Sequence, residues 1–273
     1  MQLQWRRADA DVQPLAWGFV ERRDGAPTGS VLHFPIGYPI LQVILSGAYR
    51  VDGPGMIGPI AGATLWGGSI EMRGAAAEGV LHTFTAALTF EGAALLLRGP
   101  PRLAMGQILD AEALPSLTGS ALRERLVLAN SFSERVRHLQ DFFRQLALIG
   151  VQGRTDARIT RMASAVATDA WLGSVSRWAR EAGLSERTLY NRVQREIGCA
   201  PKRLLRLARL QRLLRTLHPM PWAGHPATDP LLEFADEAHM HREFALLTGL
   251  RPRQFTTAKA RSGDRLIHSV SAA

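Results

Sequence analysis

Apolar and polar positions follow two different patterns along the chain, and the change between them divides it into two parts. The runs 40–51, 62–70 and 80–90 are rich in β-branched and aromatic residues and are separated by Gly- and Pro-containing clusters, a pattern typical of short strands. From Ser131 onward, apolar residues recur at three- and four-residue spacing, which is typical of helices. The pattern predicts an α+β chain in which a β-rich, barrel- or sandwich-like domain over 1–110 is followed by helices.

A helical extension of the β-rich domain is predicted over 111–150. Ser131 and Glu134 have the spacing of a capping box, in which each residue satisfies an amide of the first helical turn. The apolar stripe that follows consists of Phe132, Val136, Leu139, Phe142, Phe143 and Leu146. We expect this stripe to pack against the β-rich domain, with a dimer contact as the less favoured alternative.

A stretch of the C-terminal part occurs twice, at a shift of 51 positions. The copies begin at Ser185 and Asp236, and each has an N-cap residue, an apolar pair four residues apart and a glycine where the helix ends. Because so short a repeat cannot bury its own apolar face, each copy must belong to a larger helical unit. The repeat therefore predicts two helix-turn-helix units.

The side chains opposite the apolar pairs are candidates for nucleic-acid contact. Residues near the start of a recognition helix reach deepest into a major groove, so the first helix offers Arg187, Thr188 and Asn191 for base reading. The complete set of candidate DNA-binding residues is Ser185, Arg187, Thr188, Asn191, Arg192, Arg195, Lys202, Ala238, His239 and Arg242. The alternative, two ordinary solvated helix faces, is disfavoured because the caps, glycines and prolines of the two copies match.

One long helix is predicted to join the two units. Residues 202–217 place leucines on one side, and Arg203, Arg206, Arg209, Arg212 and Arg215 recur at every third position. We expect some of these arginines to contact phosphates or acidic side chains and others to be solvated. Prolines within 219–230 then break the helical pattern.

The net charge supports a polyanionic partner because it is concentrated in one region. Residues 1–150 hold 13 Lys and Arg against 13 Asp and Glu, whereas residues 151–273 hold 20 against 11, which is the whole excess of +9. Residues 176–215 alone carry 11 basic and 3 acidic side chains. Such a patch suits a phosphate backbone. A basic helix on a membrane surface is the competing interpretation, but glycines at 183 and 198 interrupt the segment.

Several other classes of protein are disfavoured. The single cysteine, Cys199, excludes an internal disulfide and a cysteine-cluster zinc site. His33 and His82 have no metal-ligand spacing, and no nucleophile motif or phosphate loop is present, so we expect no enzyme activity and no cofactor. With no secretory signal and no apolar run of membrane-spanning length, we expect a cytoplasmic protein without membrane contact.

The expected organisation is completed by the connecting segments. GVQGRT (150–155) is the predicted linker, and a helix over Ile159–Trp171 leads to Ser174, the N-cap of a supporting helix. The predicted divisions are 1–110 for a sensor or dimerisation domain, 111–150 for its helical extension, 151–173 for linker and helix, 174–258 for the double helix-turn-helix domain and 259–273 for a polar tail.

The two copies resemble the AraC/XylS-type transcriptional regulators. The residues that carry the resemblance are Ala179, Gly183, Ser185, Leu189, Gly198, Pro201, Arg209 and Leu210 in the first unit, and Phe234, Asp236, His239, Arg242, Glu243, Phe244, Thr248, Gly249, Pro252 and Phe255 in the second. The resemblance covers about 174–258 and, more loosely, residues 1–150, which are similar to the N-terminal β-domain and helices of a subgroup of these regulators. It implies a sequence-specific transcription regulator, here expected to be an activator, whose two units read successive major grooves of double-stranded DNA. A small-molecule effector, a homodimer and contact with RNA polymerase are further partners it suggests.

The chain also departs from the family pattern. Glu233 stands where glycine is usual, and Pro226 and Pro230 fall within the supporting helix expected for the second unit. Two alternatives to the main hypothesis therefore stay open. One is a degenerate regulator that acts through protein partners, and the other, less favoured, is a cupin-like metal enzyme.

Overall fold

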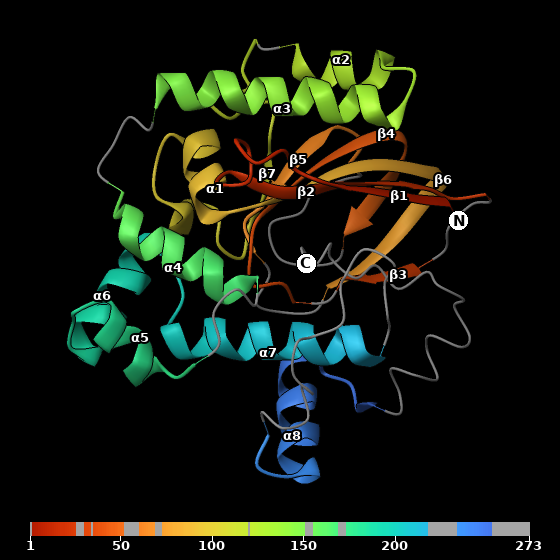
Figure 1. Cartoon of the computed structure of the whole chain (residues 1–273). Helices are drawn as coiled ribbons and strands as arrows, with labels where there is room; N and C mark the ends of the chain where they lie inside the picture. Colours follow the sequence, from red (N-terminus) through yellow and green to blue (C-terminus); the bar gives the residue numbers. More distant parts are fainter. Residues whose placement is uncertain are drawn as a thin grey trace.

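The computed structural model describes residues 2–25, 30–33, 35–51, 60–68, 73–119, 121–150, 155–168, 173–217 and 234–252. A β-sheet forms the centre of the N-terminal part. Helices cover one of its faces, and a second group of helices from the C-terminal part lies on the other side (Figure 1). The prediction of a β-rich N-terminal domain followed by a helical domain is confirmed.

The sheet has seven antiparallel strands. They are β1 (Gln2–Arg7), β2 (Ala16–Arg23), β3 (Ser30–His33), β4 (Ile40–Val51), β5 (Ala63–Trp66), β6 (Arg73–Leu88) and β7 (Ile108–Asp110). The order is β1-β2-β6-β4-β5-β7, and β3 also pairs with β6. The long β6 strand is thus the centre of the sheet, because β2, β3 and β4 all pair with it.

The predicted strand over 80–90 extends too far at its C-terminal end. The strand ends at Leu88, and a helix that the hydrophobic pattern did not indicate follows, α1 (Phe90–Leu97). Thr89 starts this helix, because its Oγ1 accepts a hydrogen bond from the Gly92 amide at 2.9 Å. The apolar run continues through the boundary, so the cap residue is the main local sign of the change.

Two helices, α2 (Leu122–Leu128) and α3 (Phe132–Ile149), cover one face of the sheet (Figure 1). The capping box is confirmed: the Glu134 amide donates to Ser131 Oγ at 3.2 Å, and the Glu134 carboxylate accepts from the Asn130 amide at 2.8 Å. All six residues of the predicted stripe are buried and share one core with strand residues such as Phe19 and Phe84. The prediction that this stripe packs on the β-domain is therefore confirmed.

A second core joins the sheet to the C-terminal helices α4 (Ala157–Ala167), α5 (Val175–Glu181), α6 (Glu186–Ile197) and α7 (Pro201–Leu217). Tyr38 and Trp66 of the N-terminal domain belong to the same buried cluster as Trp178, Leu189 and Leu204. The short 3-10 helix η1 (Pro101–Leu103) also contacts α6. The first helical unit is thus packed directly on the N-terminal domain.

The boundaries of α4 differ from the prediction. The helix begins at Ala157, two residues before the expected start, because the Asp156 carboxylate accepts from the Ile159 amide at 3.3 Å and caps it. It ends at Ala167 with Thr168 as its C-cap, whereas the prediction extended it to 171. Residues 151–154 of the predicted linker and residues 169–172 lie outside the described residues.

The last described helix, α8 (Glu237–Thr248), packs against α7 (Figure 1). Leucines of α7, among them Leu207, Leu210 and Leu214, form a third core with Met240 and Phe244. The prolines of 219–230, Glu233 and the predicted tail at 259–273 lie outside the described residues. Within the described part of the chain, no helix is both long enough and apolar enough to cross a membrane.

Candidate nucleic-acid interface

Helices α6 and α8 are two copies of one element. Both contain 12 residues and begin and end at positions 51 apart. Ser185 Oγ accepts from the Thr188 amide at 3.1 Å, and Asp236 accepts from the His239 amide in the same position. Each helix ends at a glycine in the left-handed conformation, Gly198 with φ of 89° and Gly249 with φ of 70°. The predicted N-caps and helix ends are confirmed in both copies.

The inner faces of the two copies are buried against different neighbours. Leu189 and Val193 of α6 lie among Trp178 and the helices α4, α5 and α7, and both are 0% exposed. Met240 and Phe244 of α8 contact α7. Burial of these pairs leaves the opposite faces of α6 and α8 as the surfaces available to a partner.

The outer face of α6 presents polar groups that have no competing protein contact. Arg187 and Asn191 are exposed, and neither has a hydrogen-bond or ion-pair partner among the described residues. Ser185 and Thr188 lie at the start of the same face, with their hydroxyl oxygens 2.8 Å apart. Their capping role fixes the first turn of α6, from which Arg187 and Asn191 project into solvent.

Arg192 and Arg195 have protein partners. Arg192 Nη1 lies 3.2 Å from Asp156 Oδ2 at the start of α4, so this side chain ties two helices together. Arg195 Nε lies 3.0 Å from Glu196, and the Arg195 side chain is 65% exposed. Lys202 is exposed at the beginning of α7. Arg195 and Lys202 are thus accessible from solvent, whereas Arg192 has a structural role.

The corresponding face of α8 is less polar. Arg242 and Ala238 are exposed, and Arg242 has no partner among the described residues. The His239 ring accepts a hydrogen bond from the Ala235 amide at 3.2 Å and packs edge-on against Phe234, 5.6 Å between ring centroids. Of the three candidates on α8, Arg242 therefore has the freest polar group, and His239 holds the turn before the helix.

Two residues of the α6 face were not among the sequence candidates. Tyr190 is 50% exposed, an unusual position for a large aromatic side chain, and Gln194 is exposed one turn further on. Tyr190 is three positions after Arg187, and Gln194 is four positions after Tyr190, so the three side chains follow one side of the helix. An aromatic residue outside the apolar stripe was the signal that could have found this site.

Three arginines of α7 face protein groups rather than solvent. Arg206 Nε lies 2.7 Å from Glu243 Oε2 of α8, and the Arg209 guanidinium lies 5.4 Å from the centre of the Phe234 ring. Arg212 is only 5% exposed. The expectation of acidic partners is confirmed for Arg206. Arg212 is too deeply buried to be one of the solvated arginines.

The N-terminal domain has its own buried polar group. Glu21 of β2 lies 2.8 Å from His82 Nε2 of β6 and 3.1 Å from Arg135 Nη1 of α3. These contacts join the helical layer to the sheet. The described residues contain no group of three or more His, Cys, Asp or Glu side chains that could hold a metal ion. Burial raises the pKa of the Cys199 thiol to about 12, which makes it a poor nucleophile.

This chain is similar to one family model and to several solved structures. Residues 178–258 match a family model described as a helix-turn-helix domain. The apo form of a lysine-to-alanine variant of ToxT from Vibrio cholerae has a similar fold, with a TM-score of 0.51 and 10% identity over 92% of this chain and 99% of that chain. ToxT bound to a naphthalenyl butenoic acid gives a TM-score of 0.49 and 11% identity over 94% and 99%. The AraC-like activator CuxR gives 0.33 and 14% over 78% and 86%. No curated protein matches the sequence significantly.

The C-terminal region is thus an AraC-type helix-turn-helix domain. The whole chain shares with ToxT the arrangement of an N-terminal β-domain followed by a helical domain. A helix-turn-helix domain places its second helix in the major groove of DNA. The family match therefore supports a DNA-binding role for residues 178–258.

Proposed function

We propose that this chain is a sequence-specific transcription regulator that reads double-stranded DNA with α6 and α8, the recognition helices of two units joined by α7. The observation that carries the proposal is the outer face of α6. There Arg187 and Asn191 are exposed and have no partner among the described residues, while the opposite face is fully buried. Arginine and asparagine are the side chains best suited to bidentate contacts with guanine and adenine, respectively.

The length of the connecting helix supports a two-site footprint. At 1.5 Å per residue, the 17 residues of α7 form a rod of about 25 Å. Successive major grooves on one side of DNA are about 34 Å apart. A rigid helix of this length between α6 and α8 supports a proposal in which the two helices contact neighbouring segments of one DNA site.

Site selection from a random double-stranded DNA pool tests this function. We expect an enriched motif with two segments one helical turn apart. The affinity for this motif should fall steeply as the salt concentration rises, because phosphates release counterions when the protein binds. Failure to enrich any motif, with only weak and sequence-independent affinity, contradicts the proposal and favours action through protein partners.

The exposed face of α8 supports a narrower proposal, in which only α6 reads the base sequence. On α8, Ala238 offers no polar group, His239 is held by the preceding turn and Leu246 is 71% exposed. These features favour a second unit that mainly contacts the phosphate backbone of the DNA. Selection would then return a motif with a single specified segment, read by α6.

The proposal also covers the N-terminal domain and the way in which the protein regulates transcription. The N-terminal domain acts as a sensor for a small-molecule effector or as a dimerisation domain, and the protein works in the cytoplasm as an activator in contact with RNA polymerase. The proposal assigns no catalytic activity to the chain. Analytical ultracentrifugation of the purified protein, with and without its selected DNA, measures the proposed dimer directly.

A further inference from the structure

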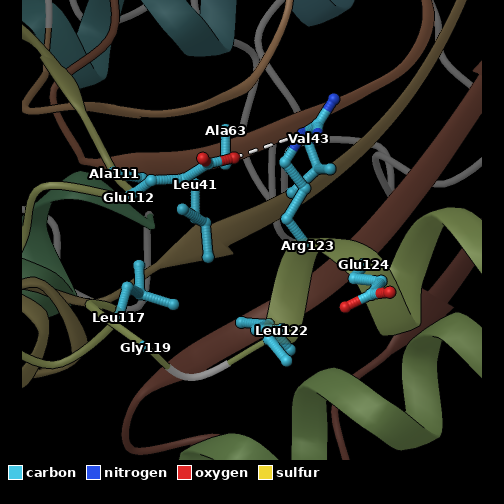
Figure 2. A pocket seen from close by; sticks show the side chains of 11 residues that line it. Leu41, Val43, Ala63, Ala111, Glu112, Leu117, Gly119, Leu122, Arg123 and Glu124 are labelled. Atoms are coloured by element: carbon cyan, nitrogen blue, oxygen red, sulfur yellow. Dashed lines mark ion pairs between the residues drawn. The ribbon is translucent and has the colours of Figure 1, made fainter.

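The N-terminal domain contains a cavity of about 320 Å³, on the sheet face that α2 and α3 cover and separate from the DNA-reading helices. Its walls are β4, β5, the segment after β7 and the beginning of α2 (Figure 2). We propose that this cavity binds a small organic cation, an apolar body that carries a protonated amine. The inference deepens the effector part of the proposed function and rests on it for its biological meaning, while the binding itself is independent of DNA.

The floor of the cavity is apolar. Leu41, Val43 and Ala63 of the sheet and Leu117 and Leu122 on the opposite side are all at most 8% exposed. The volume lies within the range of small-molecule sites, which are mostly apolar with a few polar groups that orient the ligand. Apolar side chains around an unfilled space lose dispersion contacts, so a ligand with an apolar body gains affinity by filling it.

The polar groups at the mouth select the charge of the ligand. Arg123 Nε lies 3.2 Å from Glu112 Oε1, and Arg123 also donates to the Ala61 carbonyl at 3.4 Å. Figure 2 shows Arg123 reaching across to Glu112, with Glu124 on the other side of it. The Glu124 carboxylate has no partner among the described residues.

The lining therefore holds two carboxylates against one guanidinium, and that guanidinium is already paired. The neighbouring Asp110 adds a third carboxylate, which accepts a hydrogen bond from the Glu112 amide at 2.9 Å. An anionic ligand would compete with Glu112 for the Arg123 guanidinium in a field of like charge. A cationic ligand meets Glu124 directly, and so the electrostatics favour the ammonium group.

The backbone beside the cavity is held in an unusual conformation. Ala121, which lines the cavity, is left-handed with φ of 50° although it has a Cβ atom. Such residues are strained and persist where the surrounding structure requires them, often at ligand sites. The turn at Ala121 directs the chain into α2, which places Leu122 on the floor and Arg123 at the mouth.

Isothermal titration calorimetry on the full chain without DNA tests the proposal, using three probes with the same phenyl group. The probes are phenethylammonium, the neutral phenethyl alcohol and the anionic hydrocinnamate. Phenethylammonium is expected to bind most tightly and hydrocinnamate most weakly. Equal or tighter binding of hydrocinnamate, or no binding of phenethylammonium, overturns the proposal and leaves the DNA-binding proposal untouched.

Two variants locate the bound cation. Glu124→Gln removes one negative charge from an exposed position and is expected to weaken phenethylammonium binding about 3- to 5-fold, the scale of an exposed ion pair. Glu78→Gln, on the exposed part of β6, is the matched control and leaves the affinity unchanged. If Glu124→Gln binds phenethylammonium as tightly as the wild type, the cation does not bind beside Glu124 and the proposal is overturned. The same holds if Glu124→Gln and Glu78→Gln lose equal affinity.

Discussion

The guanidinium of Arg206 on α7 lies 2.7 Å from the carboxylate of Glu243 on α8, and the two side chains are only 23% and 18% exposed. The pair lies beside the leucine contacts through which α7 holds α8. Since α7 also packs on the N-terminal domain through Leu204, the orientation of α8 depends on a helix that both parts of the molecule share. The ion pair thus fixes the position of α8 on α7.

Replacement of Arg206 and Glu243 by alanine, singly and together, measures this link. Because the pair is mostly buried, a double-mutant cycle in urea unfolding is expected to give a coupling energy of about 1 kcal/mol. The exposed Arg177–Glu181 pair of α5, at the same 2.7 Å distance, is the control and is expected to give about 0.3–0.5 kcal/mol. Equal coupling energies in the two cycles would show that burial does not strengthen the interaction between Arg206 and Glu243.

The repeated glycines allow the contact between the first unit and the N-terminal domain to be isolated. Gly198 and Gly249 both have positive φ, but a Cβ atom at Gly198 would lie 3.0 Å from the Cβ atoms of Arg102 and Met105, whereas Gly249 has no described atom within 4 Å of that position. Alanine at Gly249 is expected to destabilise the chain by about 1 kcal/mol through backbone strain alone.

Alanine at Gly198 carries the same strain and must also displace Arg102 or Met105, which adds about 1–2 kcal/mol. Thermal unfolding of the two variants gives the difference. A larger loss in Gly249→Ala than in Gly198→Ala would mean that the packing of α6 on η1 is looser than the structure shows.

Glu91 gives the stability a specific pH dependence. Burial raises the pKa of this carboxyl, although Ser164 Oγ donates a hydrogen bond to it at 2.8 Å and partly opposes the shift. The folded chain therefore binds this proton more tightly than the unfolded chain, in which the pKa is about 4.3. As pH rises from the pKa of the unfolded chain through the raised pKa of the folded chain, the contribution of Glu91 to the free energy of unfolding falls.

Urea unfolding of the wild type and of Glu91→Gln between about pH 4 and pH 7 measures this contribution. The variant is expected to lack the decrease, so that its stability relative to the wild type grows with pH. Ser164→Ala, which removes the opposing hydrogen bond, is expected to make the decrease larger. A constant difference between wild type and Glu91→Gln over this range would show that Glu91 titrates alike in both states.

Local signals in the sequence predicted much of the fold. Ser131, Ser174 and Ser185 were identified as caps, and each accepts the expected amide hydrogen bond. The apolar pairs of α6 and α8 were likewise identified from their spacing. These features depend on neighbours within one or two turns, which a sequence displays directly.

Features that depend on distant contacts could not be predicted in the same way. α1 continues an apolar run that looks like a strand, and its burial against Ser164 and α4 requires the folded chain. The pairing of Arg192 with Asp156 joins residues 36 positions apart, and no local pattern distinguishes it from a solvated arginine. Arg212 looks like part of a regular arginine stripe, yet the N-terminal domain on one side of α7 and α8 on the other bury most of that helix.

The central claim, that the outer face of α6 reads DNA sequence, is tested most directly by fluorescence anisotropy on selected and scrambled DNA. Arg187→Ala and Asn191→Ala are compared with Arg137→Ala, an exposed arginine on α3. The account predicts that each α6 variant loses about 1–3 kcal/mol of discrimination between the two DNAs, while Arg137→Ala keeps the wild-type ratio. Unchanged discrimination in both α6 variants would contradict it.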